Sequence, residues 1–289
     1  MDLPVRRIVR PGSLPEALAV LAGKPGARAL AGGTDLVVQL RDGRRSADTL
    51  VDLGRLEFTS IAMHGNLLEI GAAATMDDVA RHSSVRRMAP SLADAAAKVG
   101  AWPIQCRATL GGNLANASPA ADTAPPLLIA GASVRVAGIA GERTIPLDAF
   151  FRGPGATALH PDELIVSILV PPPPSGPIVE RFVKVGPRRE QIIATVSFAG
   201  RAEIASDGRL HGVRVALGAV APTPRRARGV EACVEGRKPD AELRREAAIA
   251  VQDDIAPIDD VRASAGYRRI AAAVLVDRFL RSAEEDRRE

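Results

Sequence analysis

The chain has 289 residues, of which 46% are hydrophobic and 25% charged, so it can bury one or two full hydrophobic cores. No stretch approaches the roughly 20 apolar residues of a membrane-spanning helix, and the first residues lack the apolar segment of a signal peptide, so we expect a cytoplasmic protein without a membrane span. The net charge of +4 is spread over short arginine groups interleaved with acids, and only 3% of the residues are aromatic, which argues against nucleic-acid binding.

Cysteine and histidine are too sparse and too scattered to predict a metal site. Cys106 and Cys233 are far apart and form no CxxC pair, so we expect neither a disulfide framework nor a cysteine-bound cluster. No two histidines have a spacing that would place both on one helix face, and we expect each to be a surface or loop residue: His64, His82, His160 and His211. Any redox chemistry must therefore use an organic cofactor.

The first residues predict a strand, a helix and a second strand that leads into a Gly-Gly pair. We expect the strand over 5–9 and the helix over 13–23, with Ser13 and Glu16 at the spacing of a capping box and Gly23 at the C′ position. The segment LAGGTDL follows a strand over 27–31 and precedes a short helix over 35–43. The first Gly-Gly turn is therefore placed at a strand-to-helix junction.

The middle of the chain alternates short apolar runs with helical patterns. The pattern predicts a strand over 49–54, a hairpin with its break at 64–66, and helices over 75–82 and 91–100. The second Gly-Gly turn, in TLGGNLANASPAAD, follows an irregular stretch over 101–108 and precedes an apolar helix over 121–132. Three further strands are expected, over 133–138, 142–147 and 163–170.

The proline run PPPPSGP, residues 171–177, is the clearest break in the sequence, and we place a domain boundary there. Beyond it we expect strands over 179–186, 194–204 and 212–220, the last two joined across Asp207-Gly208. The tail is helical, because Tyr267, Ile270 and Val274 step by three and four, and Leu275 and Phe279 widen this predicted buried stripe.

Two Gly-Gly turns with hydroxyl or amide neighbours indicate a ligand that carries a diphosphate. Backbone N–H groups of a glycine turn form an anion-binding concavity, because the missing Cβ permits close approach and positive φ. Thr34, Thr109 and Asn113 add polar side chains, and the helix after each turn adds its positive end. Each pair alone is more often only a tight turn, and the pattern does not say which diphosphate is bound.

Five segments of the sequence, taken together, resemble a known family. The segments LAGGTDL and TLGGNLANASPAAD, then DELIVSILVP, FVKVGPRRE with QIIATVSFA, and SAGYRR with IAAAVLV are similar in order and spacing to the FAD-binding medium subunits of molybdenum hydroxylases. That family includes flavin subunits of carbon monoxide dehydrogenase and of bacterial xanthine dehydrogenase-type enzymes. The resemblance covers essentially the whole chain, and five ordered motifs make it far more specific than either Gly-Gly pair.

The resemblance implies an α+β protein made of an FAD-binding domain and a smaller C-terminal domain. The FAD-binding domain would have two subdomains of the vanillyl-alcohol oxidase (PCMH) type, over residues 1–57 and 58–174. The C-terminal domain, over residues 178–284, would combine a three-stranded antiparallel sheet with helices.

The resemblance also implies which residues bind FAD. The implied set is Ala29, Leu30, Ala31, Gly32, Gly33, Thr34, Asp35, Leu36, Val99, Thr109, Gly111, Gly112, Asn113, Asp122, Ile165 and Lys184. The two Gly-Gly motifs would embrace the pyrophosphate, Asp122 would bind a ribose or ribityl hydroxyl, and Lys184 would lie near the flavin ring. Val99 and Ile165 would pack on the adenine side, and Ile192 or Ile193 would approach the isoalloxazine ring.

Each of these roles has a purely structural alternative. Asp122 is also suited to cap the helix that follows it, and Lys184 to be an exposed strand lysine. Val99, Ile165, Ile192 and Ile193 would be core residues in either case. Trp102, the single tryptophan, is interpreted as a core or interface anchor rather than as a flavin-stacking residue.

The implied function is electron transfer without a catalytic residue or a metal of its own. FAD would receive electrons from a small 2Fe-2S subunit, while the substrate is oxidised on a large molybdopterin-binding subunit, in a dimer of heterotrimers. Thr34-Asp35 stands where carbon monoxide dehydrogenases tend to have His-Ser, and no cysteine-rich insertion is present, which favours a hydroxylase of aldehydes, purines or N-heterocycles. The alternatives are a stand-alone sugar-nucleotide-binding protein and a flavin reductase of related fold, and the organic substrate and final acceptor stay open.

Overall fold

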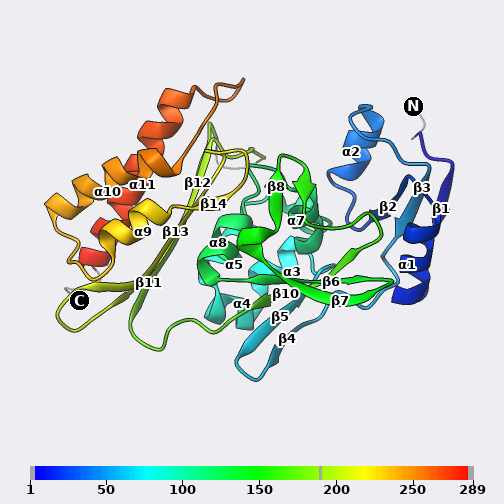
Figure 1. Ribbon diagram of the computed structural model, residues 1–289, viewed down its shortest axis with the longest axis horizontal. Coiled ribbons are helices and arrows are strands. Elements are labelled where there is room, and N and C mark those ends of the chain that lie inside the picture. Colours follow the sequence, from blue (N-terminus) through cyan, green and yellow to red (C-terminus); the bar gives the residue numbers. More distant parts are fainter. Residues whose placement is uncertain (1–3, 189–190, 286–289) are drawn as a thin grey trace.

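Three larger β-sheets follow one another along the chain in the computed structural model, which describes residues 4–188 and 191–285 (Figure 1). The first sheet is parallel, with the strand order β1-β3-β2. Its strands are β1 (Arg7–Val9), β2 (Ala27–Leu30) and β3 (Thr49–Asp52), and its helices are α1 (Leu14–Gly23) and α2 (Leu36–Arg41). These elements confirm the strand–helix–strand–helix order predicted for this segment.

Helix α1 begins with half of the predicted capping box. The Ser13 Oγ accepts a hydrogen bond from the Glu16 N–H at 3.4 Å, as expected. The Glu16 carboxylate accepts from the N–H of Gly12, the residue before the N-cap, at 2.7 Å, and not from the N–H of Ser13 as a capping box requires. The predicted glycine C′ cap does not form: Gly23 is the last residue of α1, and Lys24 after it is extended.

The second sheet is antiparallel, with the strand order β4-β5-β10-β6-β7. Its strands are β4 (Ile61–His64), β5 (Leu67–Gly71), β6 (Ser133–Gly138), β7 (Gly141–Pro146) and β10 (Leu164–Val170). Between β5 and β6 lie α3 (Met76–Arg81), α4 (Ser83–Met88), α5 (Pro90–Ala96), α6 (Trp102–Gln105), α7 (Leu110–Asn116) and α8 (Ala124–Ala130). The turn η1 (Leu147–Ala149) and the hairpin of β8 (Phe151–Gly153) and β9 (Ala156–Thr157) complete this part.

The second Gly-Gly pair is not a turn. Gly111 and Gly112 lie in the first turn of α7, whose N-cap residue Thr109 accepts a hydrogen bond from the Gly112 N–H at 3.1 Å. Neither glycine has positive φ, whereas Gly33 of the first motif does, at 75°. The expectation of positive φ is therefore right for the first motif and wrong for the second, where α7 is a helix that the sequence pattern did not predict.

The third sheet is antiparallel and has four strands instead of the expected three. Its order is β11 (Ile178–Val185), β12 (Val196–Ile204), β13 (Leu210–Gly218) and β14 (Arg225–Arg226). The two-residue β14 is too short for an alternating pattern to reveal it. Helices α9 (Arg228–Val234), α10 (Ala241–Asp254) and α11 (Ala265–Glu285) cover one face, while α5 and α8 pack on the other (Figure 1).

Helix α11 buries a different face from the one predicted. Tyr267, Ile270 and Val274 are 49%, 67% and 42% exposed, so the predicted stripe is wrong for these three residues. Leu275 and Phe279 are buried as expected. The rest of the buried face consists of Arg268, Ala272, Val276, Leu280 and Ala283. The last four also have helical spacing, so the sequence offers two possible stripes and the chain buries the one that was not chosen.

A buried ion pair ties the third sheet to α5. Arg201 of β12 donates to the Glu180 carboxylate of β11 at 2.5 Å, and their side chains are only 4% and 2% exposed. The Ser91 N–H at 3.0 Å and the Ser91 hydroxyl also donate to Glu180. This carboxylate therefore joins two strands of the third sheet to a helix that covers the second sheet. Within the described residues, no helix combines the length and the apolar character needed to cross a membrane.

Candidate functional site

A cavity of about 1090 Å³ lies where the three sheets meet. Its wall includes β2 and the loop after it, α7 and the loop after α7, the segment around Ile165, and parts of the C-terminal region near 191–193 and 256–268. A volume of this size is at the upper end of what small-molecule and cofactor sites show. Fourteen of the residues expected to bind a cofactor line it: Ala29, Ala31, Gly32, Gly33, Thr34, Asp35, Leu36, Val99, Thr109, Gly111, Gly112, Asn113, Asp122 and Ile165.

The first Gly-Gly motif presents a run of available backbone donors to this cavity. The described residues supply no hydrogen-bond partner to the N–H groups of residues 32–36. The chain leaves β2 at Leu30, turns with Gly33 at positive φ, and enters α2 at Leu36. Successive unpaired N–H groups before a helix form a concavity that favours an anion.

The second motif contributes in a different way, because its own N–H groups are already used. The N–H groups of Leu110 and Gly111 donate to the carbonyls of Ala74 and Ala72, and that of Gly112 donates to Thr109 Oγ1. The donors left for a ligand are side-chain groups, such as the amide nitrogen of Asn113, whose oxygen accepts from Thr123 at 2.6 Å. The glycines here serve close packing: a Cβ on Gly111 would lie 2.7 Å from Ala72.

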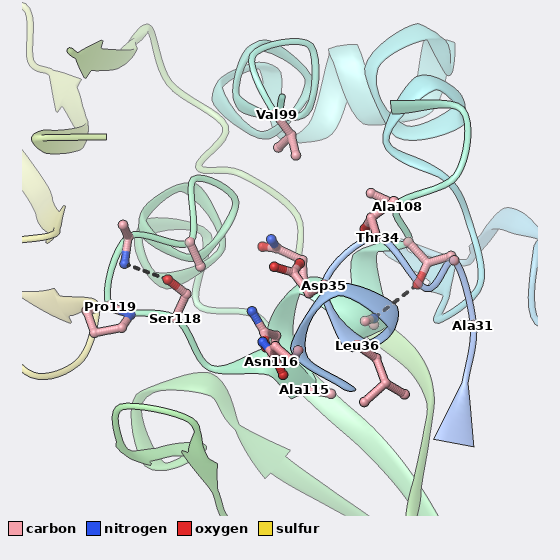
Figure 2. Close-up of a pocket in the computed structure, with 18 of the residues that line it drawn as sticks. Ala31, Thr34, Asp35, Leu36, Val99, Ala108, Ala115, Asn116, Ser118 and Pro119 are labelled. Atoms are coloured by element: carbon pink, nitrogen blue, oxygen red, sulfur yellow. Dashed lines mark hydrogen bonds between the residues drawn. The ribbon is translucent and has the colours of Figure 1, made fainter. Parts of the chain in front are cut away.

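The two motifs are held against each other by one close contact and one hydrogen bond. A Cβ on Gly32 would lie 1.8 Å from the carbonyl oxygen of Arg107, so only glycine fits there. The Gln39 amide, on α2, donates to the Asn116 amide oxygen, on α7, at 2.9 Å. Both motifs line the same cavity (Figure 2), and that they face one ligand stays a prediction.

Asp122 and Lys184 form a buried ion pair at the wall of the cavity. The Lys184 Nζ donates to Asp122 Oδ2 at 2.6 Å and to the Lys98 carbonyl at 2.8 Å, and the two side chains are 4% and 8% exposed. The other carboxylate oxygen, Asp122 Oδ1, is buried without a partner among the described residues. Burial raises the pKa of Asp122 to about 6, although the charges of Lys184 and Lys98 oppose the rise.

Both structural alternatives for this pair are wrong. Asp122 caps no helix, since the N-cap residue of α8 is Thr123 and no side-chain capping bond is made. Lys184 is not an exposed strand lysine, because its side chain is almost fully buried. Lys184 does not line the cavity itself, however, and neither does Leu30, which packs with Leu40 and Leu50 in a small core.

Apolar residues close other parts of the wall. Val99 points into the cavity from the side opposite Asp35 and Asn116 (Figure 2). Ile165 is buried on β10 at a register shift of the ladder, as expected for a core residue. Ile192 and Ile193 also line the cavity, but Ile193 is 54% exposed, so the expectation of a core residue is wrong there.

Trp102 is 62% exposed, which excludes the core part of its interpretation and leaves an interface anchor as a prediction.

Several polar lining residues were not predicted. Asn116 and Ser118 lie within the second motif, after its Gly-Gly pair, and are on the cavity wall with Pro119 (Figure 2). The polar and small residues of NASPAAD were a signal for them, but only Asn113 and Asp122 were selected. Arg28, Arg45, His160 and Arg268 also line the cavity, and these reach it from separate strands, loops and α11, so no local pattern reveals them. The described residues contain no cluster of three or more His, Cys, Asp or Glu that could hold a metal.

Comparisons with known proteins match the chain over nearly its whole length. The family described as FAD binding domain in molybdopterin dehydrogenase matches residues 4–173, and the family described as CO dehydrogenase flavoprotein C-terminal domain matches residues 181–283.

A xanthine dehydrogenase FAD-binding subunit of Escherichia coli O157:H7 is 32% identical over 262 residues, which are 90% of this chain and 89% of that protein. The glyceraldehyde dehydrogenase medium chain of Sulfolobus acidocaldarius is 31% identical over 92% of this chain and 94% of its own length. The structure of a carbon monoxide dehydrogenase from Hydrogenophaga pseudoflava is similar with a TM-score of 0.94 at 30% identity, over 99% of both chains.

Proposed function

The chain belongs to the FAD-binding medium subunits of molybdenum hydroxylases, and from that membership we propose how its cavity holds the cofactor. As a subunit of this kind it is part of an oxidoreductase and transfers electrons through FAD. The observation that carries the proposal is the pairing, in one cavity, of unpaired backbone N–H groups with an unpaired carboxylate oxygen. A dinucleotide needs both: donors for its phosphates and an acceptor for its hydroxyls.

The residues of the cavity fit FAD. The N–H groups of residues 32–36 bind the pyrophosphate, and the Asn113 amide adds a donor from the second motif. Asp122 Oδ1 accepts from a ribose or ribityl hydroxyl, which would give this buried oxygen the partner it lacks. Gly111 and Gly112 leave room for the backbone and the ligand to approach each other, since neither carries a Cβ.

The ring systems of FAD are assigned to the apolar parts of the wall. Val99 and Ile165 pack on the adenine-side part of the cofactor, and Ile192 or Ile193 packs near the isoalloxazine ring. When bound, FAD supplies the redox chemistry by accepting electrons and passing them on. The protein positions the ring, excludes water from it and supplies the charges around it, and no side chain of the chain has to act as acid, base or nucleophile.

The partners follow from the same proposal. Electrons reach this chain from a small 2Fe-2S subunit, after substrate oxidation on a large molybdopterin-binding subunit, and the complex is a cytoplasmic dimer of heterotrimers. The relatives named above carry the names of different substrates, xanthine, glyceraldehyde and carbon monoxide. Because such different enzymes share this subunit, we assign substrate choice to the large subunit.

We assign the three sheets to three units with the boundaries expected from the sequence: 1–57 and 58–174 as FAD-binding subdomains of the vanillyl-alcohol oxidase type, and 178–284 as the C-terminal domain. The family matches support the boundary between the FAD-binding part and the C-terminal domain, since one match ends at residue 173 and the next begins at 181. The strand β11 begins at Ile178, directly after the proline run.

The visible absorption spectrum of the purified protein, with identification of any released cofactor, tests the binding mode. We expect close to one FAD per chain, and its loss in Gly112→Val, whose side chain would start 2.8 Å from Thr109 Oγ1 at the cavity wall. A folded protein that stays colourless after incubation with FAD would overturn the proposal. A folded Gly112→Val protein that keeps its full FAD content would show that the second motif does not take part in FAD binding.

A further inference from the structure

We propose that Lys184 is a positioning residue for the cofactor, which keeps Asp122 ionised and fixes its carboxylate so that Oδ1 is the acceptor for an FAD hydroxyl. The inference rests on the proposed function, in which Asp122 binds that hydroxyl. It replaces the expectation that Lys184 meets the flavin ring directly. In this arrangement the C-terminal sheet takes part in cofactor binding through a residue that does not itself line the cavity.

The geometry of the pair assigns separate tasks to the two carboxylate oxygens. Lys184 extends from β11 and places its ammonium between Asp122 Oδ2, at 2.6 Å, and the Lys98 carbonyl, at 2.8 Å. The second bond ties the ammonium to the backbone of Lys98, which restrains its position beside the carboxylate. Oδ2 is therefore occupied, and Oδ1 is left as the free acceptor of a residue that lines the cavity.

The charge balance around Asp122 depends chiefly on Lys184. Burial disfavours the ionised carboxylate, and the groups that oppose this effect are Lys184, by charge and hydrogen bond, and then Lys98, by charge alone. The Lys98 ammonium lies over the Phe182 ring, 5.3 Å from its centre, and makes no contact with the carboxylate. Loss of the Lys184 charge would leave burial nearly unopposed, so the pKa of Asp122 would rise above its present value of about 6.

A protonated Asp122 is a weaker acceptor than an ionised one, because hydrogen bonds to charged groups are the stronger ones. The affinity for FAD should therefore increase as the pH rises through the pKa of Asp122. The pH at which this increase occurs reports the charge environment of the carboxylate. A lysine that only held two domains together would change the affinity without moving that pH.

The experiment measures the dissociation constant of FAD, by flavin fluorescence, for the full-length apo protein from about pH 5 to about pH 9. We expect wild-type affinity to increase around pH 6. Lys184→Met should bind FAD roughly ten- to a hundredfold more weakly at neutral pH and should show its increase at a higher pH. Asp122→Asn should lack the increase, and adding Lys184→Met to it should cause little further loss, because the lysine acts through the aspartate.

Two further variants separate positioning from folding. Lys184→Gln keeps a neutral donor in the same place and should also shift the increase to higher pH, so it serves if Lys184→Met does not fold. Glu180→Gln disturbs a different buried contact of β11 and should leave the pH of the increase at its wild-type value. If Lys184→Met and Lys184→Gln increase in affinity at the wild-type pH, the inference is wrong. If the wild-type protein binds no FAD at any pH, it is the proposed function that fails.

Discussion

Gly32 occupies the closest approach between the two glycine motifs, where its Cα faces the Arg107 carbonyl. A side chain there cannot be accommodated by a rotamer change, because the neighbour is backbone. Gly23, at the end of α1, has open space around it and ordinary φ, and is its matched control.

Gly32→Ala should therefore lower the free energy of unfolding by at least about 3 kcal/mol, at the upper end of what overpacking costs. Gly23→Ala should be neutral or stabilising by up to about 1 kcal/mol, because alanine favours helix. Urea denaturation of both variants measures this difference. Equal stabilities would mean that the loop before the second motif moves away freely.

Because burial raises the pKa of Asp122, we expect the stability of the apo protein to depend on pH. Its pKa in the folded state is about 6, above the ordinary value near 3.9, so the folded protein binds more protons than the unfolded chain between these values. Protonation of Asp122 therefore adds about 3 kcal/mol to the free energy of unfolding at low pH. This stabilisation is lost as the pH rises toward 6. Asp122→Asn should lack this decrease when both proteins are unfolded in urea at several pH values. If wild type and Asp122→Asn lose the same stability over this pH range, the titrating group is not Asp122.

Helix α11 illustrates why spacing alone selects the wrong face. Tyr267, Ile270 and Val274 satisfy the helical period, but they face outward. The buried face has the same period and consists of Arg268, Ala272, Leu275, Val276, Phe279, Leu280 and Ala283. The buried Arg268 side chain donates to the carbonyls of Thr195 and Ala219, which are distant in sequence, and to the Asp260 carboxylate, eight residues earlier.

The two faces should respond differently to truncation. Leu275→Ala should destabilise the protein by about 2 to 5 kcal/mol, because Leu275 is 3% exposed in the core between α11 and the third sheet. Ile270→Ala, at 67% exposure, should change stability by no more than about 0.5 kcal/mol. Thermal unfolding of the two variants gives the comparison, and a large effect of Ile270→Ala would indicate that this face is covered.

Among the other elements, strands could be predicted where one face is buried and the strand is long enough to show alternating hydrophobic and polar residues. The hairpin at His64-Gly65-Asn66 and the strands β6, β7 and β10 confirm their predictions. Helix α4 was not predicted because Val85 and Met88 are its only apolar residues, and β14 because it has two residues. Helix α7 was not predicted, because Gly-Gly favours a turn in isolation, while Thr109 and the carbonyls of Ala72 and Ala74 support a helix only in the folded chain.

The site could be predicted as far as its local motifs allow. Both Gly-Gly motifs and Asp122 were found, because each belongs to a continuous segment. The pairing of Asp122 with Lys184 joins residues 62 positions apart, and a single sequence shows no sign of it. The arginines at positions 28, 45 and 268 join the cavity from three different regions, and only the folded chain brings them together.

The FAD-binding part and the C-terminal part should unfold together because the Glu180 carboxylate of β11, paired with Arg201 of β12, also accepts from the Ser91 N–H of α5. Arg201→Met leaves Glu180 buried and without its ion-pair partner, and should cost about 3 to 5 kcal/mol. Arg209→Met breaks a surface pair with Asp207, about half exposed on each side, and should have no measurable effect. Urea unfolding followed by circular dichroism measures both. An Arg201→Met protein as stable as wild type would show that solvent reaches Glu180 readily.

The order in which the cavity wall is synthesised sets the time at which the holoprotein can form. The first motif leaves the ribosome early, yet Ile192, the loop near residue 256 and Arg268 complete the wall only much later. A nascent chain that carries the FAD-binding domain alone therefore exposes a half-built cleft. A chain that ends at the proline run carries both glycine motifs and Asp122 but neither Lys184 nor Arg268, so its cavity wall is incomplete and Asp122 has no ammonium partner.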